Sequence, residues 1–440
     1  MTYLSRNGVT VLLVLAACGP VADSGDASDS SADHDDAGTS AGDITAASMD
    51  PGSSGGTDAQ EPDPTEAGDV STAGDEGTTT ASMTTGEPDA PTCWQFELAV
   101  DSPGRTPAMG LAVAADHLLL GGTPTTSGLA RVGGGEVTWE KSETVPGAGL
   151  FVTEVAPVGD GVFAFGTISS DEHETGRALW MGRVDADGEP IWSRELGPAH
   201  ANVWAHVDAR VHPAGGFFVS TDDGVPGSDQ ALRLLHIDDA GETVWATQYP
   251  LQPDLDIAIN WSLGAMDVLA DGGVVQVTAA PDAVRVIRTD DAGALVWEMS
   301  LADIGWPRDV VALPDGGFAV LTSTVDAAFL ARIDGDGKSV GASKYQQGPE
   351  SNATALAHDP ATDTFLIAGG TRGVDGPDAS LERTWLIVAD SDGDAKWVHV
   401  GEAGTPSHTY EVRVTGPGAY ALSAHGEQLW VATVTTCDPI

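Results

Sequence analysis

The chain has 440 residues and a formal net charge of −47, with only 19 Lys and Arg against 66 Asp and Glu. Nucleic-acid phosphates are bound mainly by Lys and Arg, so this charge excludes nucleic acid from the expected partners. The acidic excess is uneven, since no Lys or Arg occurs between Arg6 and Arg105.

Residues 1–17 are expected to be a signal peptide. Arg6 precedes the apolar stretch Val9–Ala17, which only Thr10 interrupts and which is too short to span a bilayer. The closing residues Leu15-Ala16-Ala17-Cys18 resemble the lipobox of bacterial lipoproteins. This resemblance implies cleavage before Cys18 and a diacylglyceryl thioether on its sulfur, with two or more acyl chains sufficing as a stable anchor. The alternative is an ordinary signal peptide with an incidental Cys.

Residues 18–92 are expected to form an acidic, disordered tether. Positions 19–91 hold 17 acidic residues and no Lys or Arg, among Asp, Ser, Thr, Ala, Gly and Pro. Such a segment has almost no large apolar side chains to offset the entropy lost on ordering, and its charges repel one another. It would hold the next domain away from the membrane, or serve as a solvated spacer of no specific length.

From Cys93 onward, apolar residues recur with the period of β-strands, and no helical period appears. One unit recurs: a short apolar strand, an Asp/Gly turn and a second strand that usually carries Trp. The copies are Gly128–Ser142, Ala178–Leu196, Ala231–Pro250, Ala283–Ala302, Ala328–Gln346 and Thr384–Glu402. Trp139, Trp192, Trp245 and Trp297 mark successive copies at intervals of 53, 53 and 52 residues. A fixed period of this size indicates a repeat architecture.

Two further strands precede each unit, as in Val207–Gly216 followed by Phe217–Thr221. The predicted fold class is therefore all-β: a seven-bladed β-propeller over residues 93–440, with four-stranded antiparallel blades. The last blade contains only three strands before Ile440. We expect the N-terminal strand, which begins at Cys93-Trp94, to pair beside Gln428–Thr436 and complete it.

The same register predicts a disulfide between Cys93 and Cys437. It places Cys437, just after the third strand, near Cys93, just before the fourth. An exported compartment permits the bond. Closing a loop of about 345 residues would contribute at most about 5–6 kcal/mol in the chain-entropy model. Two incidental thiols are the alternative.

The segment Val184–Trp192, V-D-A-D-G-E-P-I-W, and its copies resemble the repeats of bacterial propellers related to quinoprotein dehydrogenases and to the outer-membrane assembly lipoprotein family. They are also similar to Asp/Gly-Trp repeats in surface proteins of myxobacteria. The resemblance implies the propeller fold. In the quinone-dependent enzymes the cofactor needs Ca²⁺-binding acids, a stacking Trp and adjacent cysteines. No stretch here aligns with those groups, so no cofactor is expected.

The Asp-rich turns, such as Asp185–Gly188 and Asp334–Gly337, begin like Ca²⁺ loops. An EF-hand loop also needs a bidentate Glu at its twelfth position, which is not systematically acidic here. We interpret these segments as hairpin turns with Asp at the start and Gly in the left-handed conformation, and we expect no metal site. The recurring Trp residues could stack on a sugar, but their repetition favours packing between blades.

Residues that break the repeat are better candidates for function. They lie ahead of innermost strands or between second and third strands, and they are Trp204, His206, Trp261, Trp306, Asp222, Asp223 and Asp375. Propeller loops converge at the channel mouth, where ligands are usually bound. Aromatic platforms beside carboxylates suit a sugar or a cationic peptide; the alternative is that the Trp residues cap the rim and the acids are solvated. No nucleophile elbow, H-E-x-x-H motif or selectable pair of acids indicates a catalytic residue.

The sequence thus predicts a monomeric propeller, lipid-anchored to the bacterial outer membrane and either periplasmic or surface-exposed. It would bind a carbohydrate or a protein at the mouth loops without catalysis. The alternatives are a hydrolase or lyase acting on carbohydrate or peptide, and a scaffold subunit of an envelope assembly complex. An enzyme predicts clustered carboxylates with shifted pKa values at the mouth. A scaffold predicts an apolar patch on the outer wall.

Overall fold

The computed structural model describes residues 94–103, 110–114, 117–122, 128–133, 136–142, 149–169, 177–199, 207–222, 231–250, 265–280, 283–348, 350–372, 383–401, 408–425 and 428–436. The predicted signal peptide and tether, and all three cysteines (Cys18, Cys93 and Cys437), lie outside these ranges. Every regular element within them is a β-strand. In particular, these ranges contain no helix that could cross a membrane.

The strands form seven sheets, which we number as blades in chain order. Blade 1 consists of β2 (Gly110–Val113), β3 (Leu118–Gly121), β4 (Gly128–Gly133) and β5 (Glu136–Ser142). Blade 2 consists of β6 (Gly149–Val158), β7 (Gly161–Ser169), β8 (Arg177–Val184) and β9 (Pro190–Ala199). Blade 3 consists of β10 (Val207–Val211), β11 (Phe217–Asp222), β12 (Ala231–Ile237) and β13 (Thr243–Pro250).

Blade 4 consists of β14 (Met266–Val268), β15 (Val274–Ala280), β16 (Ala283–Thr289) and β17 (Leu295–Ala302). Blade 5 consists of β18 (Trp306–Ala312), β19 (Phe318–Ser323), β20 (Ala328–Ile333) and β21 (Ser339–Tyr345). Blade 6 consists of β22 (Glu350–Asp359), β23 (Thr364–Arg372), β24 (Arg383–Asp390) and β25 (Ala395–Val400). Blade 7 consists of β26 (His408–Gly416), β27 (Ala419–His425), β28 (Gln428–Thr436) and the N-terminal strand β1 (Trp94–Pro103).

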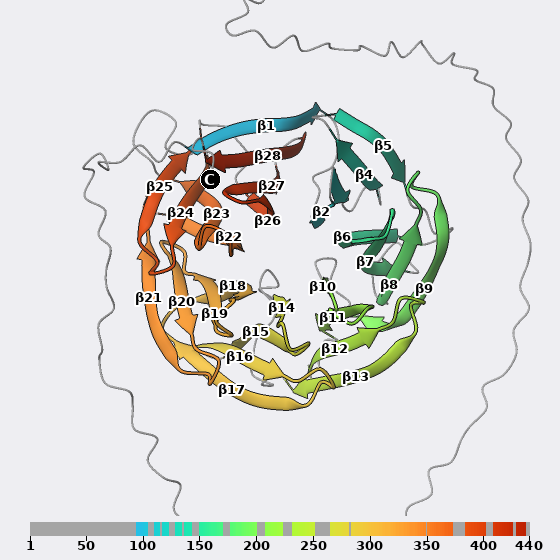
Figure 1. Cartoon of the computed structure of the whole chain (residues 1–440), viewed down its shortest axis with the longest axis horizontal. Coiled ribbons are helices and arrows are strands. Elements are labelled where there is room, and N and C mark those ends of the chain that lie inside the picture. The colour runs from blue at the N-terminus through green and yellow to red at the C-terminus, as the bar shows by residue number, and fades with distance from the viewer. Residues whose placement is uncertain are drawn as a thin grey trace, which may run out of the picture. The chain divides into compact units, whose positions relative to one another are not determined.

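The blades are arranged in a ring, with the first strand of each nearest the centre and the fourth at the rim (Figure 1). This confirms the predicted all-β, seven-bladed propeller. The predicted closure is also confirmed, because β1 pairs antiparallel with β28 from Trp94 opposite Thr436 to Pro103 opposite Gln428. The sequence of blade 7 therefore comes from both ends of the described domain.

The hairpins between third and fourth strands follow from local side-chain chemistry. In the turn of blade 4, the Asp290 carboxylate accepts the N–H groups of Ala292 and Ala294 at 3.0 and 2.8 Å. Gly293 has a φ of 75°, a conformation that costs side chains other than glycine about 1–2 kcal/mol. The turns that begin at Asp185, Asp238, Asp334 and Asp390 have the same two hydrogen bonds.

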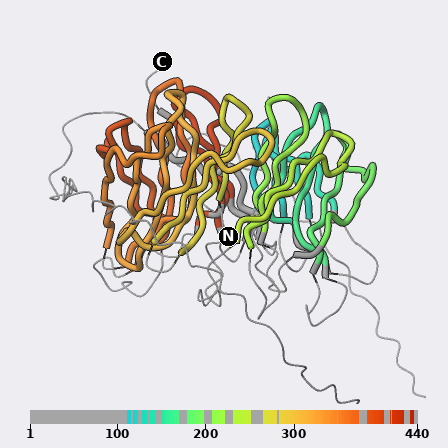
Figure 2. The backbone as a smooth tube through the Cα atoms, turned by 90° about the horizontal axis from the view of Figure 1, so that it is seen from below, coloured from blue at the N-terminus to red at the C-terminus, as the bar shows by residue number. Residues whose placement is uncertain are grey.

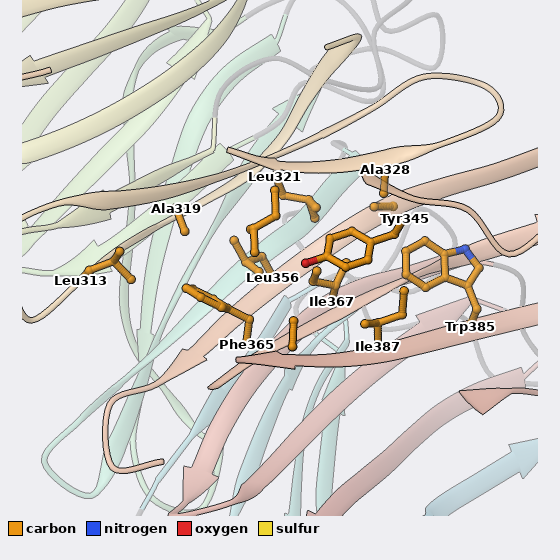
Figure 3. Packing of buried hydrophobic residues seen from close by; sticks show 13 residues of the cluster. Leu313, Ala319, Leu321, Ala328, Tyr345, Leu356, Phe365, Ile367, Trp385 and Ile387 are labelled. Atoms are coloured by element: carbon orange, nitrogen blue, oxygen red, sulfur yellow. The ribbon is translucent and has the colours of Figure 1, made fainter. Parts of the chain in front are cut away.

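Apolar clusters between adjacent blades form the core. One joins blades 5 and 6, where Tyr345 and Trp385 pack among Leu321, Leu356 and Ile367 (Figure 3). The Tyr345 hydroxyl donates a hydrogen bond to the Gly393 carbonyl at 2.6 Å, so this phenol also bridges the two blades. Burial of two sheet faces per interface is the main source of stability in such a ring.

Strands run between the two faces of the ring (Figure 2). We call one the turn face; it carries the hairpins between first and second strands and between third and fourth strands, such as 212–216 and 238–242. The opposite, mouth face is where innermost strands begin and second strands end. Since β1 runs antiparallel to β28, the described chain enters blade 7 at the turn face.

Candidate functional site

The predicted mouth residues are only partly described. Trp306 is the first residue of β18, opposite Ser323, and its side chain is 39% exposed at the mouth face. Val325, in the next hairpin of the same blade, is 63% exposed on that face. Asp222 is the last residue of β11, paired with Leu232, rather than part of a loop. The other five candidates, Trp204, His206, Trp261, Asp223 and Asp375, lie outside the described residues.

Four innermost strands have a bulge close to the mouth. The irregularities lie between Val152 and Glu154, Pro307 and Asp309, Ala353 and Ala355, and Thr409 and Glu411. Each inserts one residue that the pairing partner does not match, and such bulges bend a strand and redirect side chains. The inserted Thr153 donates to the carbonyl of Val207 in the next blade at 3.4 Å. The inserted residue of β18 is Arg308, two positions after the exposed Trp306. Burial lowers the pKa of its guanidinium.

Beyond the bulges, the centre of the ring contains a buried charged cluster. The strand registers place four carboxylates at one level, those of Glu154, Asp208, Asp309 and Glu411. Two residues further along their strands lie Arg210 in β10 and Arg413 in β26. Asp267 occupies the corresponding position in β14 of blade 4. We call these seven residues the central cluster.

The two arginines connect three blades. The Arg210 guanidinium contacts the carboxylate of Asp208 in its own strand and lies 3.4 Å from Glu154 and 3.9 Å from Glu411. Arg413 contacts Glu411 and lies 3.7 Å from Glu154. Ion pairs therefore span from blade 7 to blades 2 and 3 across the centre. Removing one partner of such a buried network leaves the other charges uncompensated.

The aspartates of the cluster also join neighbouring innermost strands. Asp208 accepts the N–H of Met266 at 2.8 Å, and Asp267 accepts the N–H of Ala312 at 2.7 Å. Asp309 likewise accepts the N–H of Leu356 at 2.8 Å. In each case the donor belongs to the next blade, so these three carboxylates link blades 3 to 6 in succession.

Five carboxylates share the central cluster with two guanidiniums, which makes ionisation of all five costly. Burial is the largest cause, and it raises the pKa of Glu154 to about 7 and that of Asp309 to about 7. Burial raises the pKa of Glu411 to about 8, with Glu154 adding to the shift and Arg413 opposing it. The pKa of Asp267 is raised for the same reason. Carboxyls with raised pKa values can hold protons near neutral pH.

Both repeated features of the outer hairpins have structural contacts in the described residues. The marker Trp residues pack against the turn glycines of the next blade: a Cβ added at Gly241 would lie 2.4 Å from Trp192. The Trp139 indole donates to the Ala186 carbonyl at 2.9 Å, again across a blade interface. This confirms the interpretation of these Trp residues as packing residues. Within the described ranges, no group of three or more His, Cys, Asp or Glu could hold a metal ion.

Sequence reasoning missed the central cluster. The signal was present, because an acidic residue interrupts an apolar strand in five blades, as in Val207–Val211 (V-D-A-R-V) and Tyr410–Val414 (Y-E-V-R-V). These acids recur at similar positions in the repeat, so they do not stand out as residues that break it. Their partners come from other blades, so the sequence does not reveal which acids share one site.

The fold and the cluster define a seven-bladed β-propeller with a charged centre and an exposed aromatic residue at its mouth. The sequence matches no family model and no curated protein. Among solved structures, the chain is similar to virginiamycin B lyase from Staphylococcus aureus, with a TM-score of 0.51 and 11% identity over 78% of this chain and 99% of that one.

Two further similarities are the WD40 β-propeller domain of Doa1 and a protein of unknown function from Bacteroides caccae. The Doa1 domain has a TM-score of 0.50 and 12% identity over 77% of this chain and 96% of that one. The Bacteroides protein has a TM-score of 0.43 and 16% identity over 65% of this chain and 94% of that one. At these identities the similarity concerns the fold alone.

Proposed function

We propose that this protein is a non-catalytic binding module, lipid-anchored through Cys18 in the bacterial cell envelope, which binds a carbohydrate or a protein at its mouth face. The exposed Trp306 carries this proposal. An indole exposed at the mouth end of an innermost strand offers a flat apolar surface with one hydrogen-bond donor, which suits a sugar ring or a peptide. Val325 extends the apolar surface of the same blade.

The contacts of the central cluster support binding over catalysis. Its three aspartates accept backbone N–H groups of the next blade, and its two glutamates face arginines. Carboxylates with these contacts have a structural role, which is to join the blades. The register of β1 also suits a tethered binder, because the described chain enters the propeller at the turn face, opposite the mouth face.

The binding proposal is tested by screening detergent-solubilised full-length protein against glycan and peptide arrays. For the best ligand, Trp306→Ala should weaken binding about tenfold, because a lost aromatic contact of about 1.4 kcal/mol changes Kd by that factor. Thr138→Ala, on the outer wall, is the matched control and should leave Kd unchanged. A Kd that does not respond to Trp306→Ala would contradict binding at the mouth.

Lipid anchoring has a separate test. Growth with radiolabelled palmitate should label the protein, and Cys18→Ser should remove the label and release the protein from the membrane fraction. Label that persists in the Cys18→Ser variant would contradict a lipid on that sulfur.

A hydrolase or lyase is the second candidate, favoured by the raised pKa values of Glu154 and Glu411. A proton donor near neutral pH requires such a shift. If the array ligand is cleaved during incubation and Glu411→Gln abolishes cleavage while retaining binding, the protein is an enzyme. An intact ligand after prolonged incubation supports the binding module.

A further inference from the structure

The outer strands carry exposed aliphatic side chains at one repeated position. Ile191, Val244 and Val296 directly precede the marker Trp in blades 2, 3 and 4, and the strand register places Val340 at the same position in blade 5. Their side chains are between 52% and 68% exposed. Single exposed aliphatics are ordinary, but a succession at one position in four neighbouring blades forms an apolar arc on the wall near the turn face.

In the blades on either side of the arc, the equivalent strand position holds a polar residue. Blade 1 has Thr138 there, and blade 6 has Lys396. Both side chains are exposed or partly exposed to water. Because the same strand geometry accepts Thr and Lys elsewhere, the fold itself does not require an aliphatic residue at this position.

Ion pairs cover the interfaces at one end of the arc. The Lys141 ammonium lies 2.5 Å from the Glu189 carboxylate and joins blades 1 and 2. Arg194 lies 2.5 Å from Glu242 and joins blades 2 and 3, and its guanidinium stacks 4.6 Å from the Trp192 ring. Charged pairs thus flank Ile191 and Val244 on the side of blades 1 to 3.

At the two interfaces of blade 4, residues that cannot pair with each other replace these ion pairs. Between blades 3 and 4 the equivalent positions hold Thr247 and Ala294, and between blades 4 and 5 they hold Met299 and Lys338. Neither combination can form an ion pair. Leu295, directly before Val296, adds a further side chain that is 53% exposed. The apolar character of the wall is therefore concentrated on β17.

We propose that the β17 rim, which we define as Leu295 and Val296 with Val244 and Val340 on either side, is a docking surface for a basic protein segment bearing aliphatic side chains. The flanking turns carry the exposed acids Asp239, Asp291 and Asp336. Their charge attracts Lys and Arg around an apolar centre. A second copy of this chain is a poorer match, because it would bring the same exposed acids against this surface.

The test uses the full-length protein held in nanodiscs of zwitterionic lipid and two fluorescent peptides of equal length and charge. In one peptide Lys alternates with Val, and in the other Lys alternates with Ser. Fluorescence anisotropy at physiological salt should show about tenfold tighter binding of the Lys/Val peptide, since contact with the aliphatic rim adds to the shared charge attraction. Equal affinities for the two peptides would overturn the proposal.

Two variants test whether the β17 rim causes the difference in affinity between the two peptides. The double variant Leu295→Ser/Val296→Ser should bring the affinity ratio close to one, whereas Thr138→Ser, at the equivalent position of blade 1, should preserve it. Thermal unfolding confirms that both variants remain folded. An unchanged ratio in the double variant overturns the proposal, as does a dimer in sedimentation that only the double variant dissociates. Trp306→Ala should not alter the ratio, so this surface and the mouth face can fail independently.

Discussion

The inner and outer rings of this propeller join neighbouring blades by different chemistry. At the rim, each marker Trp packs on the glycine of the next turn, and the same contact repeats from blade to blade. At the centre, buried carboxylates and two arginines link blades 2 to 7, and these blades contribute different groups. The rim is a repeated apolar contact, whereas the centre is one irregular electrostatic network. Substitutions at the centre should therefore affect several blades, whereas substitutions at the rim should affect only two.

Removing an arginine from the centre should have the largest effect. Arg210→Ala leaves Asp208, Glu154 and Glu411 without their shared counter-charge, and breaking a buried ionic network costs about 3–5 kcal/mol. At the rim, Glu242→Gln removes only the ion pair with Arg194, whose stacking on Trp192 remains, and should cost at most about 1 kcal/mol because the Glu242 carboxylate is 70% exposed. Urea denaturation of the two variants measures both values. Similar losses would contradict the distinction between the rings.

At the rim, the largest effect should come from a turn glycine. Gly241→Ala places a methyl group 2.4 Å from Trp192 in a residue with a φ of 80°, and it should cost about 2–4 kcal/mol. Gly316 is the matched control, because its φ is 83° but a Cβ would meet nothing within 4 Å. Gly316→Ala should cost only the backbone strain of about 1–2 kcal/mol. Equal costs would show that the Trp contact does not constrain the turn.

In blade 7, the predicted disulfide would replace the rim contact with a covalent bond. Its register runs to Trp94 opposite Thr436, and the predicted Cys93–Cys437 disulfide would follow directly beyond this pair. Non-reducing mass spectrometry should find the two cysteines linked, and Cys437→Ser should lower the free energy of unfolding by about 2–4 kcal/mol. A reductant should lower the stability of the wild type by the same amount and leave the variant unaffected. Two free thiols in the folded protein would contradict the prediction.

The smallest expected effect is the pH dependence of the centre. Below the ordinary carboxyl pKa of 4.5, Glu411 is protonated in both the folded and the unfolded chain. As pH rises, the unfolded chain ionises first, so the folded protein holds more protons and loses stability until its raised pKa of about 8 is passed. Because the carboxyls of the central cluster titrate together, Glu411 alone accounts for only part of this loss.

Unfolding free energies between pH 5.5 and pH 8 test this expectation. Glu411→Gln should remove part of the slope, while Asp291→Asn, in an exposed turn of the rim, should retain it. A slope that is identical in the wild type and in Glu411→Gln would show that this carboxyl does not titrate in that interval.

Most of the fold could be predicted from the sequence, but the candidate site could be predicted only in part. The period of Trp192, Trp245 and Trp297 and the composition of the turns predict the blades, because both signals are local. Trp306 can be recognised as a candidate mouth residue because it breaks the repeat. Asp208 cannot be recognised in this way, because its role depends on the N–H of Met266, 58 residues away in another blade.

The hairpins, the number of blades and the pairing of the N-terminal strand with the last blade can all be predicted from the amino-acid sequence. These features rest on interactions within a few residues, such as those of Asp290 with Ala292 and Ala294, and on counting repeated units. By contrast, the folded ring is needed to show which polar residues meet at the centre and which aliphatic residues remain exposed around β17. Closing the ring brings Glu154, Arg210 and Glu411 together from three blades, and the strand pattern alone contains no information about contacts across the centre.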